Sequence, residues 1–167
     1  MSEEILRKYL EIKSPDDLNE VLAPNSDYSL NLVDKKDFQL NKFFYKQIGK
    51  NYQWTDRLIW TNQNWISYTS KKNLSTFVLN NNENIVGYFE LIFYKDTKEV
   101  EIAYFGILEE YFGKKLGGFL LSEAIKQSFL LDIKRIWVHT CSLDHQNALQ
   151  NYLSRGMKIF KSEIIKI

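Results

Sequence analysis

One glycine-containing segment, residues 107–118, has residue types that could hold an anion. It follows an apolar stretch and opens directly into the longest helical pattern of the chain. The N–H groups of a first helical turn have no partners within the helix, and the helix dipole adds positive potential there. Glycines let a ligand approach the backbone closely, and Lys114 and Lys115 add charge where a diphosphate would lie. The segment predicts an anion site; a strand-to-helix turn that serves only packing is the alternative.

The spacing within this segment excludes two common phosphate-binding motifs. The Gly…Gly-Lys-Ser/Thr frame of a P-loop is missing. The three-glycine spacing and the N-terminal βαβ unit of a dinucleotide-binding fold are missing as well. An anion held here would therefore be bound by a loop of another kind.

Two acidic residues in neighbouring apolar stretches could accept a proton. Glu101 is the lone acid in the stretch 100–107, where burial would raise its pKa, and Glu90 has a similar place in 85–94. If the hairpin between them turns at 95–96, the two carboxylates lie opposite one another. They must then share a proton, pair with a cation or border an open cleft. An exposed strand face on which both carboxylates are solvated is the alternative.

Other reactive side chains have simpler interpretations. His139 shares a strand face with Trp137 and Cys141, which favours a packed, neutral histidine over a base or proton relay. Cys141 has no His-Asp set to orient it and is interpreted as a small buried hydrophobe rather than a nucleophile. As the only cysteine, it excludes an intramolecular disulfide and a multi-cysteine zinc site. With only two histidines in the chain, we expect no metal site.

The elements that must position these residues follow from hydrophobic periodicity. The pattern predicts strands at 28–32, 74–79, 85–94, 100–107, 135–141 and 157–167, and helices at 38–48, 62–69, from 116 onward and at 145–154. Turn residues separate the three central strands, which predicts an antiparallel meander. Residues 1–27 fit a short amphipathic helix or an edge strand, and both stay open. The fold class is therefore α+β, with helices on both faces of one mixed, mostly antiparallel sheet.

Composition is that of one ordinary domain, so we expect residues 1–167 to form a single domain. The chain has 44% apolar and 26% charged residues, enough to bury a sizeable core. There is no apolar run of the roughly 18 residues that a membrane span needs, and the N-terminus does not resemble a signal peptide. A net charge of +1 gives no electrostatic reason to expect nucleic acid or an acidic membrane as a partner. The single cysteine fits a reduced, cytoplasmic setting.

Two segments of the second half resemble motifs of the GNAT superfamily of N-acetyltransferases. The resemblance covers about residues 74–160 and extends more loosely from residue 28. The family's acetyl-CoA loop has the form Gln/Arg-x-x-Gly-x-Gly/Ala between a strand and a helix. Here Gly117 matches that loop, Phe112 replaces the Gln or Arg, and Lys115 replaces the central glycine.

The second motif of the family, Asn-x-x-Ala-x-x-x-Tyr-x-x-x-Gly-Phe, is similar to residues 145–157. Ala148, Tyr152 and Gly156 fall at the matching spacings. His145 and Met157 replace the usual Asn and Phe, at the two ends of the motif. Each motif departs from the family's pattern at some positions, but two such motifs in the right order are stronger evidence than either motif alone.

The resemblance implies direct transfer of an acetyl group from acetyl-CoA, as co-substrate, to an amine. It implies that the diphosphate lies on the amides of 113–118. It also implies that the pantetheine arm pairs like an extra strand with about 105–107, in a gap left where that strand separates from 135–141. The cofactor-binding residues would be Phe105, Gly106, Ile107, Phe112, Gly113, Lys114, Lys115, Leu116, Gly117, Gly118 and His145.

The resemblance also suggests two catalytic residues. Tyr152 matches the tyrosine that protonates the departing thiolate in many members, and an aromatic residue of the core is the alternative. Glu101 is the best candidate for the base, because the Glu-Ile-x-x-Phe pattern around it resembles a strand of the histone-acetylating branch. Glu90, His139 and water stay open as the base.

The sequence leaves a second function class and the acceptor open. Phe112 and Lys115 favour a non-catalytic acyl-CoA-binding or adaptor domain, whereas Glu101 with Tyr152 favours an enzyme. The acceptor would be a small-molecule or peptide amine. The aromatic-rich segment 52–60 has no clear period, and its side chains either line the acceptor site or cover the core: Trp54, Asp56, Arg57 and Trp60. We expect a cytoplasmic monomer or homodimer that binds neither nucleic acid nor membrane.

Overall fold

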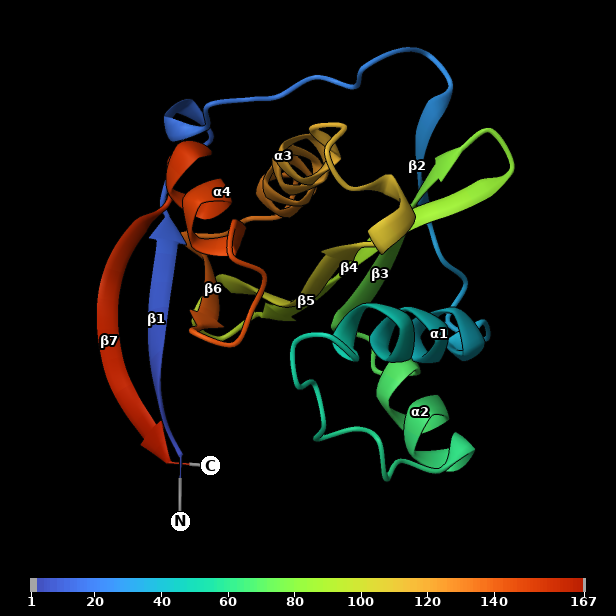
Figure 1. The fold of residues 1–167 in the computed structure, drawn as a ribbon. Coiled ribbons are helices and arrows are strands. Elements are labelled where there is room, and N and C mark those ends of the chain that lie inside the picture. Colours follow the sequence, from blue (N-terminus) through green and yellow to red (C-terminus); the bar gives the residue numbers. More distant parts are fainter. Residues whose placement is uncertain (1–2, 167) are drawn as a thin grey trace.

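The computed structural model describes residues 3–166, which form one seven-stranded sheet with helices on either side (Figure 1). The strands lie in the order β2-β3-β4-β5-β6-β1-β7. Only β5 and β6 are parallel; the other neighbouring pairs are antiparallel. The strands are β1 (Glu4–Ile12), β2 (Tyr28–Leu32), β3 (Leu74–Asn81), β4 (Asn84–Tyr94), β5 (Glu99–Ile107), β6 (Arg135–Cys141) and β7 (Lys158–Lys166). The predicted α+β class with a mixed, mostly antiparallel sheet is confirmed.

Helices cover both faces of the sheet, as the amphipathic patterns predict. In Figure 1, α3 (Leu116–Phe129) and α4 (Ala148–Ser154) lie on one face, and α1 (Phe38–Gly49) and α2 (Asn62–Thr69) lie on the other. The larger buried cluster contains the apolar side chains of α3. In the smaller cluster, Phe44 of α1 stacks on Tyr88 of β4 with ring centres 4.8 Å apart. Each face of the sheet therefore has its own core.

The meander β3–β4–β5 forms as predicted, but the register of its second hairpin differs. The turn occupies the four residues 95–98 rather than two, with Lys98 in the left-handed conformation (φ 55°). Glu90 consequently pairs with Tyr104, and Glu101 pairs with Ile92. The prediction that the two carboxylates lie directly opposite one another is therefore wrong.

A bulge in β5 coincides with a gap in the sheet. The register of β4 against β5 shifts after Ile102, which leaves Ala103 as an additional, unpaired residue. On the other side, β6 pairs with β5 only at 99–101. The predicted separation of the two strands is therefore present, and it begins at the bulge.

The backbone of β5 past the bulge faces this gap. The N–H of Leu108 donates to the carbonyl of Val86 in β4, at 2.8 Å. Backbone groups of successive strand residues point to alternate sides, so those of Ile107 and Phe105 point away from β4. They are directed into the gap between β5 and β6, where a strand would normally pair with them.

Of the two alternatives left open for the N-terminal segment, the strand is present over Glu4–Ile12, but it lies inside the sheet rather than at an edge. β1 is antiparallel to β6 on one side and to β7 on the other. The residues Leu10 and Ile12 are buried. The edge position is taken by β7, whose residue Lys166 pairs with Glu4 at the start of β1.

Candidate active site

A cleft of about 1000 Å³ opens at the gap between β5 and β6. Its walls come from these two strands, the loop before α3, the turn between β6 and α4, and the segment between α1 and α2. The cleft brings together all but one of the site residues that the sequence suggests: Glu101, Phe105, Gly106, Ile107, Phe112, Gly113, Lys115, Leu116, Gly117, Gly118, His145 and Tyr152. The exception is Lys114, whose ammonium group lies 5.5 Å from the ring centre of Tyr111.

The loop before α3 presents its backbone to the cleft. Gly113 has φ +81°, and a Cβ atom there would meet no other atom within 4 Å. Lys115 is the N-cap of α3 and has the left-handed conformation, with φ 62° and no side-chain capping bond. That conformation explains why the resembling family prefers glycine at this position, since a Cβ atom disfavours it.

Packing requires a glycine at some positions of the cleft but not at others. A Cβ on Gly117 would meet the amide nitrogen of Asn151 at 3.5 Å, an ordinary contact, so the fold tolerates a side chain there. A Cβ on Gly118 would collide with Arg155 of the neighbouring segment, and one on Gly106 would lie 2.7 Å from Ile48 of α1. Gly106 and Gly118 are therefore explained by packing, whereas the fold does not require glycine at position 117.

Glu101 lies half-buried at the start of the gap. Its carboxylate accepts a hydrogen bond from the hydroxyl of Tyr94, at 2.8 Å. Burial raises the pKa of Glu101 above its ordinary value, and the Tyr94 hydrogen bond and the charge of Arg57 oppose that rise. Burial therefore shifts the proton affinity of the carboxyl group in the direction that favours a role as a base.

Glu90, in contrast, is 0% exposed and fully partnered. It forms an ion pair with Arg57, at 3.2 Å, and accepts hydrogen bonds from Tyr68 at 2.6 Å and Asn41 at 2.8 Å. The alternative of a solvated carboxylate is thus wrong for Glu90. Because its oxygens are occupied and it does not line the cleft, we assign it a structural role.

Arg57 completes this buried polar cluster inside an aromatic cage. Its guanidinium carbon lies between 4.1 and 5.7 Å from five ring centres. The rings belong to Tyr45, Trp60, Trp65, Tyr68 and Tyr104. The sequence had no local signal for the cage, because its members come from α1, α2, β5 and the segment between the helices.

Tyr152 lies both in the core and at the cleft. It is only 6% exposed and belongs to the larger core cluster, with its ring 6.4 Å from that of Phe105. It also lines the cleft. Within residues 3–166 no side chain forms a hydrogen bond with its hydroxyl group. Burial and the negative charge of Asp144 raise the pKa of Tyr152 well above its ordinary value, so the hydroxyl keeps its proton at neutral pH.

The two histidines line the cleft in different ways. Burial and the charge of Arg7 lower the pKa of His139, which agrees with the packed, neutral histidine of the sequence analysis. The ring of His145 lies 5.0 Å from Phe112 and 5.8 Å from Tyr52. It therefore joins the loop before α3 to the segment after α1.

The start of α4 differs from the prediction. The helix begins at Ala148 rather than at His145, and Asn147 is its N-cap. Asp144, ahead of the helix, accepts hydrogen bonds from the Thr140 hydroxyl and the Cys141 amide, which close the turn after β6.

The aromatic-rich segment between α1 and α2 is divided between cleft and core. Trp54, Asp56 and Arg57 line the cleft, whereas Trp60 packs on Arg57. Asp56 is exposed, and its carboxylate accepts hydrogen bonds from the hydroxyls of Tyr45 at 3.0 Å and Tyr104 at 3.1 Å. Tyr45 and Tyr104 are therefore site residues that the sequence analysis missed.

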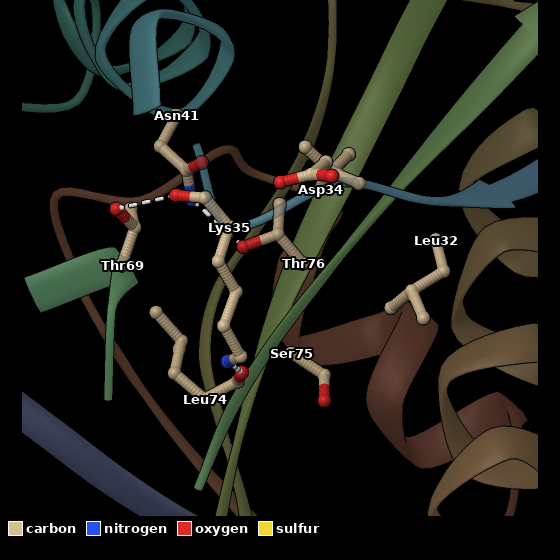
Figure 2. A pocket seen from close by; sticks show the side chains of 9 residues that line it. Leu32, Asp34, Lys35, Asn41, Thr69, Leu74, Ser75 and Thr76 are labelled. Carbon is tan, nitrogen blue, oxygen red and sulfur yellow. Dashed lines mark hydrogen bonds between the residues drawn. The ribbon is translucent and has the colours of Figure 1, made fainter. Parts of the chain in front are cut away.

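A second cavity, of about 360 Å³, lies beside β3 (Figure 2). Its polar groups bind one another: Lys35 donates to the carbonyl oxygens of Leu74 and Lys71, and Asn41 donates to the hydroxyl of Thr76 at 2.8 Å. Figure 2 shows the Lys35 side chain extended along the cavity toward Leu74. Because these partners satisfy one another, we assign this cavity no chemistry.

Within residues 3–166, no three His, Cys, Asp or Glu side chains are grouped closely enough to hold a metal ion. None of the helices in this range combines the length and the apolar character needed to span a bilayer.

Comparison with known proteins identifies the family of the chain. The model of the acetyltransferase (GNAT) family matches residues 37–157. No curated protein matches the sequence significantly. Among solved structures, a GCN5-related N-acetyltransferase from Kribbella flavida has a TM-score of 0.68 at 16% identity, over 96% of this chain and 56% of its own.

Other solved structures are similarly distant in sequence. A GCN5-related N-acetyltransferase from Sphaerobacter thermophilus has a TM-score of 0.70 at 13% identity, over 99% of this chain and 52% of its own. This chain thus spans little more than half the length of either GCN5-related protein. An aminoglycoside acetyltransferase from an uncultured soil metagenomic sample, in complex with trehalose, has a TM-score of 0.64 at 14% identity, over 77% of this chain and 86% of its own. Since the family match covers most of the sequence and the fold agrees, the chain belongs to the GNAT acetyltransferase family.

Proposed function

We propose that this protein transfers an acetyl group from acetyl-CoA to an amine, in a single cytoplasmic domain. The observation that carries the proposal is the separation of β5 from β6 after residue 101. It leaves the backbone groups of Phe105 and Ile107 open in the same cleft as the start of α3. That β1 and β7 belong to the same sheet supports one domain.

The residues of the cleft fit an acyl-CoA. The backbone of Phe105 and Ile107 would pair with the pantetheine amides, and the amides of 113–118 would hold the diphosphate. The open space at Gly113 and the absence of a side-chain cap on α3 leave room for that group. Acetyl-CoA supplies an acyl group activated as a thioester. Lys114, outside the cleft lining, would contribute charge only.

Two side chains would move the protons of the reaction. A C–N bond forms between the amine and the acyl carbon while the C–S bond breaks. Glu101, whose pKa is raised by burial, would take the proton that the amine loses, directly or through a water. The hydroxyl of Tyr152 keeps its own proton at neutral pH and would donate it to the departing thiolate. No covalent enzyme intermediate is needed.

The acceptor is proposed only as an amine, small molecule or peptide. Structures with this fold include aminoglycoside acetyltransferases, one of them in complex with sisomicin, which supports an amine. The carboxylates of Asp56 and Glu101 in the cleft suit a group that arrives protonated.

A non-catalytic acyl-CoA-binding domain is the second candidate. Two observations favour it: Phe112 packs on His145 within the cleft, and Lys115 has a backbone conformation that disfavours a side chain. Such a protein would keep the loop and the gap but would not need Glu101 or Tyr152.

The experiment is a CoA-binding titration run beside a CoA-release assay with a panel of amines. Gly117→Asp would place a carboxylate at the diphosphate position and should abolish binding, although the fold tolerates a Cβ there. Gly117→Ala is the matched control for bulk without charge, and Lys114→Ala should weaken binding only modestly. Binding without CoA release for any amine would favour the non-catalytic candidate. Unchanged affinity in Gly117→Asp would contradict the cofactor site itself.

A further inference from the structure

Resting on the proposed acetyl transfer, we infer that the acceptor carries a second positive charge, which Asp56 binds. The acceptor class would then be a diamine or polyamine, or another amine with a cationic group away from the reacting nitrogen. Asp56 would act as a specificity-determining residue rather than a catalytic one.

The carboxylate of Asp56 is held in a fixed orientation. Its oxygens accept hydrogen bonds from Tyr45 of α1 and from Tyr104 of β5, between 3.0 and 3.2 Å. The Tyr45 hydroxyl in turn accepts a hydrogen bond from the backbone N–H of Arg57, at 3.0 Å. Two elements and the segment's own backbone therefore preorganise this carboxylate, although the residue itself is exposed in the cleft.

Within residues 3–166, Asp56 takes part in no ion pair, so no cationic side chain of this part of the chain neutralises it. The adjacent Arg57 is only 6% exposed and forms its ion pair with Glu90 inside the aromatic cage, rather than with Asp56. A fixed negative charge without a counter-ion thus faces the cleft, which is the condition for attracting a cationic ligand.

Aromatic rings beside Asp56 add to the attraction of the site for a cation. Trp54 and Tyr104 both line the cleft, and their ring centres lie 4.8 Å apart in an edge-to-face arrangement. Ring faces attract ammonium groups when water is partly excluded. A carboxylate with aromatic walls is the usual chemistry of an ammonium site, and it lies on the side of the cleft formed by the segment between α1 and α2.

The ammonium held by Asp56 is distinct from the reacting nitrogen. An amine must lose its proton before it can attack an acyl carbon, so a charge–charge contact with the reacting nitrogen would be lost during the reaction. A second cation keeps its charge throughout, and its contact with Asp56 contributes to binding at every stage. Asp56 should therefore affect acceptor affinity far more than the rate of the chemical step.

The test compares two acceptors of equal length, 1,5-diaminopentane and 5-amino-1-pentanol, whose binding to the CoA-loaded protein is measured by calorimetry. The wild type should bind the diamine about 10-fold more tightly than the amino alcohol. Asp56→Asn should bind both equally while keeping its thermal stability, because the substituted side chain is exposed and still accepts a hydroxyl hydrogen bond. Asp96→Asn, in the exposed turn between β4 and β5, removes one negative charge outside the cleft and should keep the preference.

Tyr104→Phe tests the positioning role, since it keeps the ring and removes one hydrogen bond to Asp56. The variant should lose part of the preference for the diamine over the amino alcohol, and its KM for the diamine should rise at unchanged kcat. In the Asp56→Asn background, the same substitution should cause no further loss of preference. Equal or undetectable binding of the two acceptors by the wild type, or a preference that survives in Asp56→Asn, would overturn the inference. CoA release from amines without any charge preference would refute the inference alone. A charge preference in binding without CoA release would refute only the proposed transfer.

Discussion

Two glutamates on neighbouring strands have opposite surroundings. Glu101 has one hydrogen-bond donor, the hydroxyl of Tyr94, and lies at the cleft. Glu90 has a full charge partner and two further donors, and it does not line the cleft. Burial therefore makes Glu101 easier to protonate, whereas Arg57 keeps Glu90 paired. The same residue type thus serves as a candidate base in one strand and as part of the core in the next.

At this scale, Tyr94→Phe should move the acidic limb of the pH–rate profile to higher pH. The Tyr94 hydroxyl donates to the charged form of Glu101 and so lowers the pKa of that carboxyl group. Without it the pKa rises further, and the base stays protonated up to a higher pH. The measurement is kcat/KM against pH. Glu101→Gln, as the companion variant, should flatten the same limb, and a profile indifferent to both changes would assign the base to His139 or water.

Tyr152→Phe should lower turnover by roughly 10- to 1,000-fold while CoA affinity hardly changes. The substitution keeps the ring that packs near Phe105 and removes only the hydroxyl, which has no partner among residues 3–166. Steady-state kinetics and a CoA titration on the same preparation test this. A loss of activity that merely parallels a loss of thermal stability would instead support a purely structural tyrosine.

At the scale of elements, the loop before α3 contains a residue whose backbone strain a substitution can relieve. Lys115→Gly should raise the free energy of unfolding by about 1 kcal/mol, because the left-handed conformation at φ 62° disfavours a Cβ atom. Gly113→Ala is the inverse control: it should lower stability by a similar amount, through backbone strain alone, since its Cβ would meet nothing. Thermal melts of both variants decide this, and shifts of the same sign would contradict it.

Most elements could be predicted because their signals are local. Each signal lies within a short stretch of sequence, as do the alternation at 28–32, the turn residues of the meander and the apolar stripe from 116. The observed bounds of these elements differ from the predicted bounds by a few residues at most. The place of β1 could not be predicted in this way. Its partners lie more than a hundred residues further along the chain, as in the pairing of Arg7 with Cys141, and no local pattern encodes them.

The same distinction between local and long-range signals applies to the candidate site. Tyr152 and the suggested cofactor-binding residues within 105–118 could be found because the motifs are contiguous, and the cleft contains all of these suggested residues except Lys114. The hairpin register could not be found, since one four-residue turn and the bulge at Ala103 decide which side chains face each other. The hydrogen bonds of Asp56 to Tyr45 and Tyr104 also depend on tertiary packing between distant elements.

At the scale of the whole molecule, the Arg57–Glu90 pair joins α1, α2 and the segment between them to the sheet. Glu90→Gln would leave a guanidinium buried without its counter-charge, so it should cost about 3 kcal/mol of stability and lower Tm by about 10 °C. Glu101→Gln, which breaks no ion pair, should cost much less. Calorimetric melts of the two variants provide the comparison. Equal Tm values would mean that the pair contributes specificity of packing rather than stability.

The position of β1 between β6 and β7 has a consequence for the order of folding. The strands β3, β4 and β5 are joined by short turns and can pair as soon as they leave the ribosome. β1 is synthesised first but must wait, with Leu10 and Ile12 uncovered, until residues 135–166 exist to flank it. Closing so long a loop is entropically slow, and an uncovered apolar strand is prone to aggregation in the meantime. The first strand of the chain is thus the last to find its place, and chaperones have the longest opportunity to act on it.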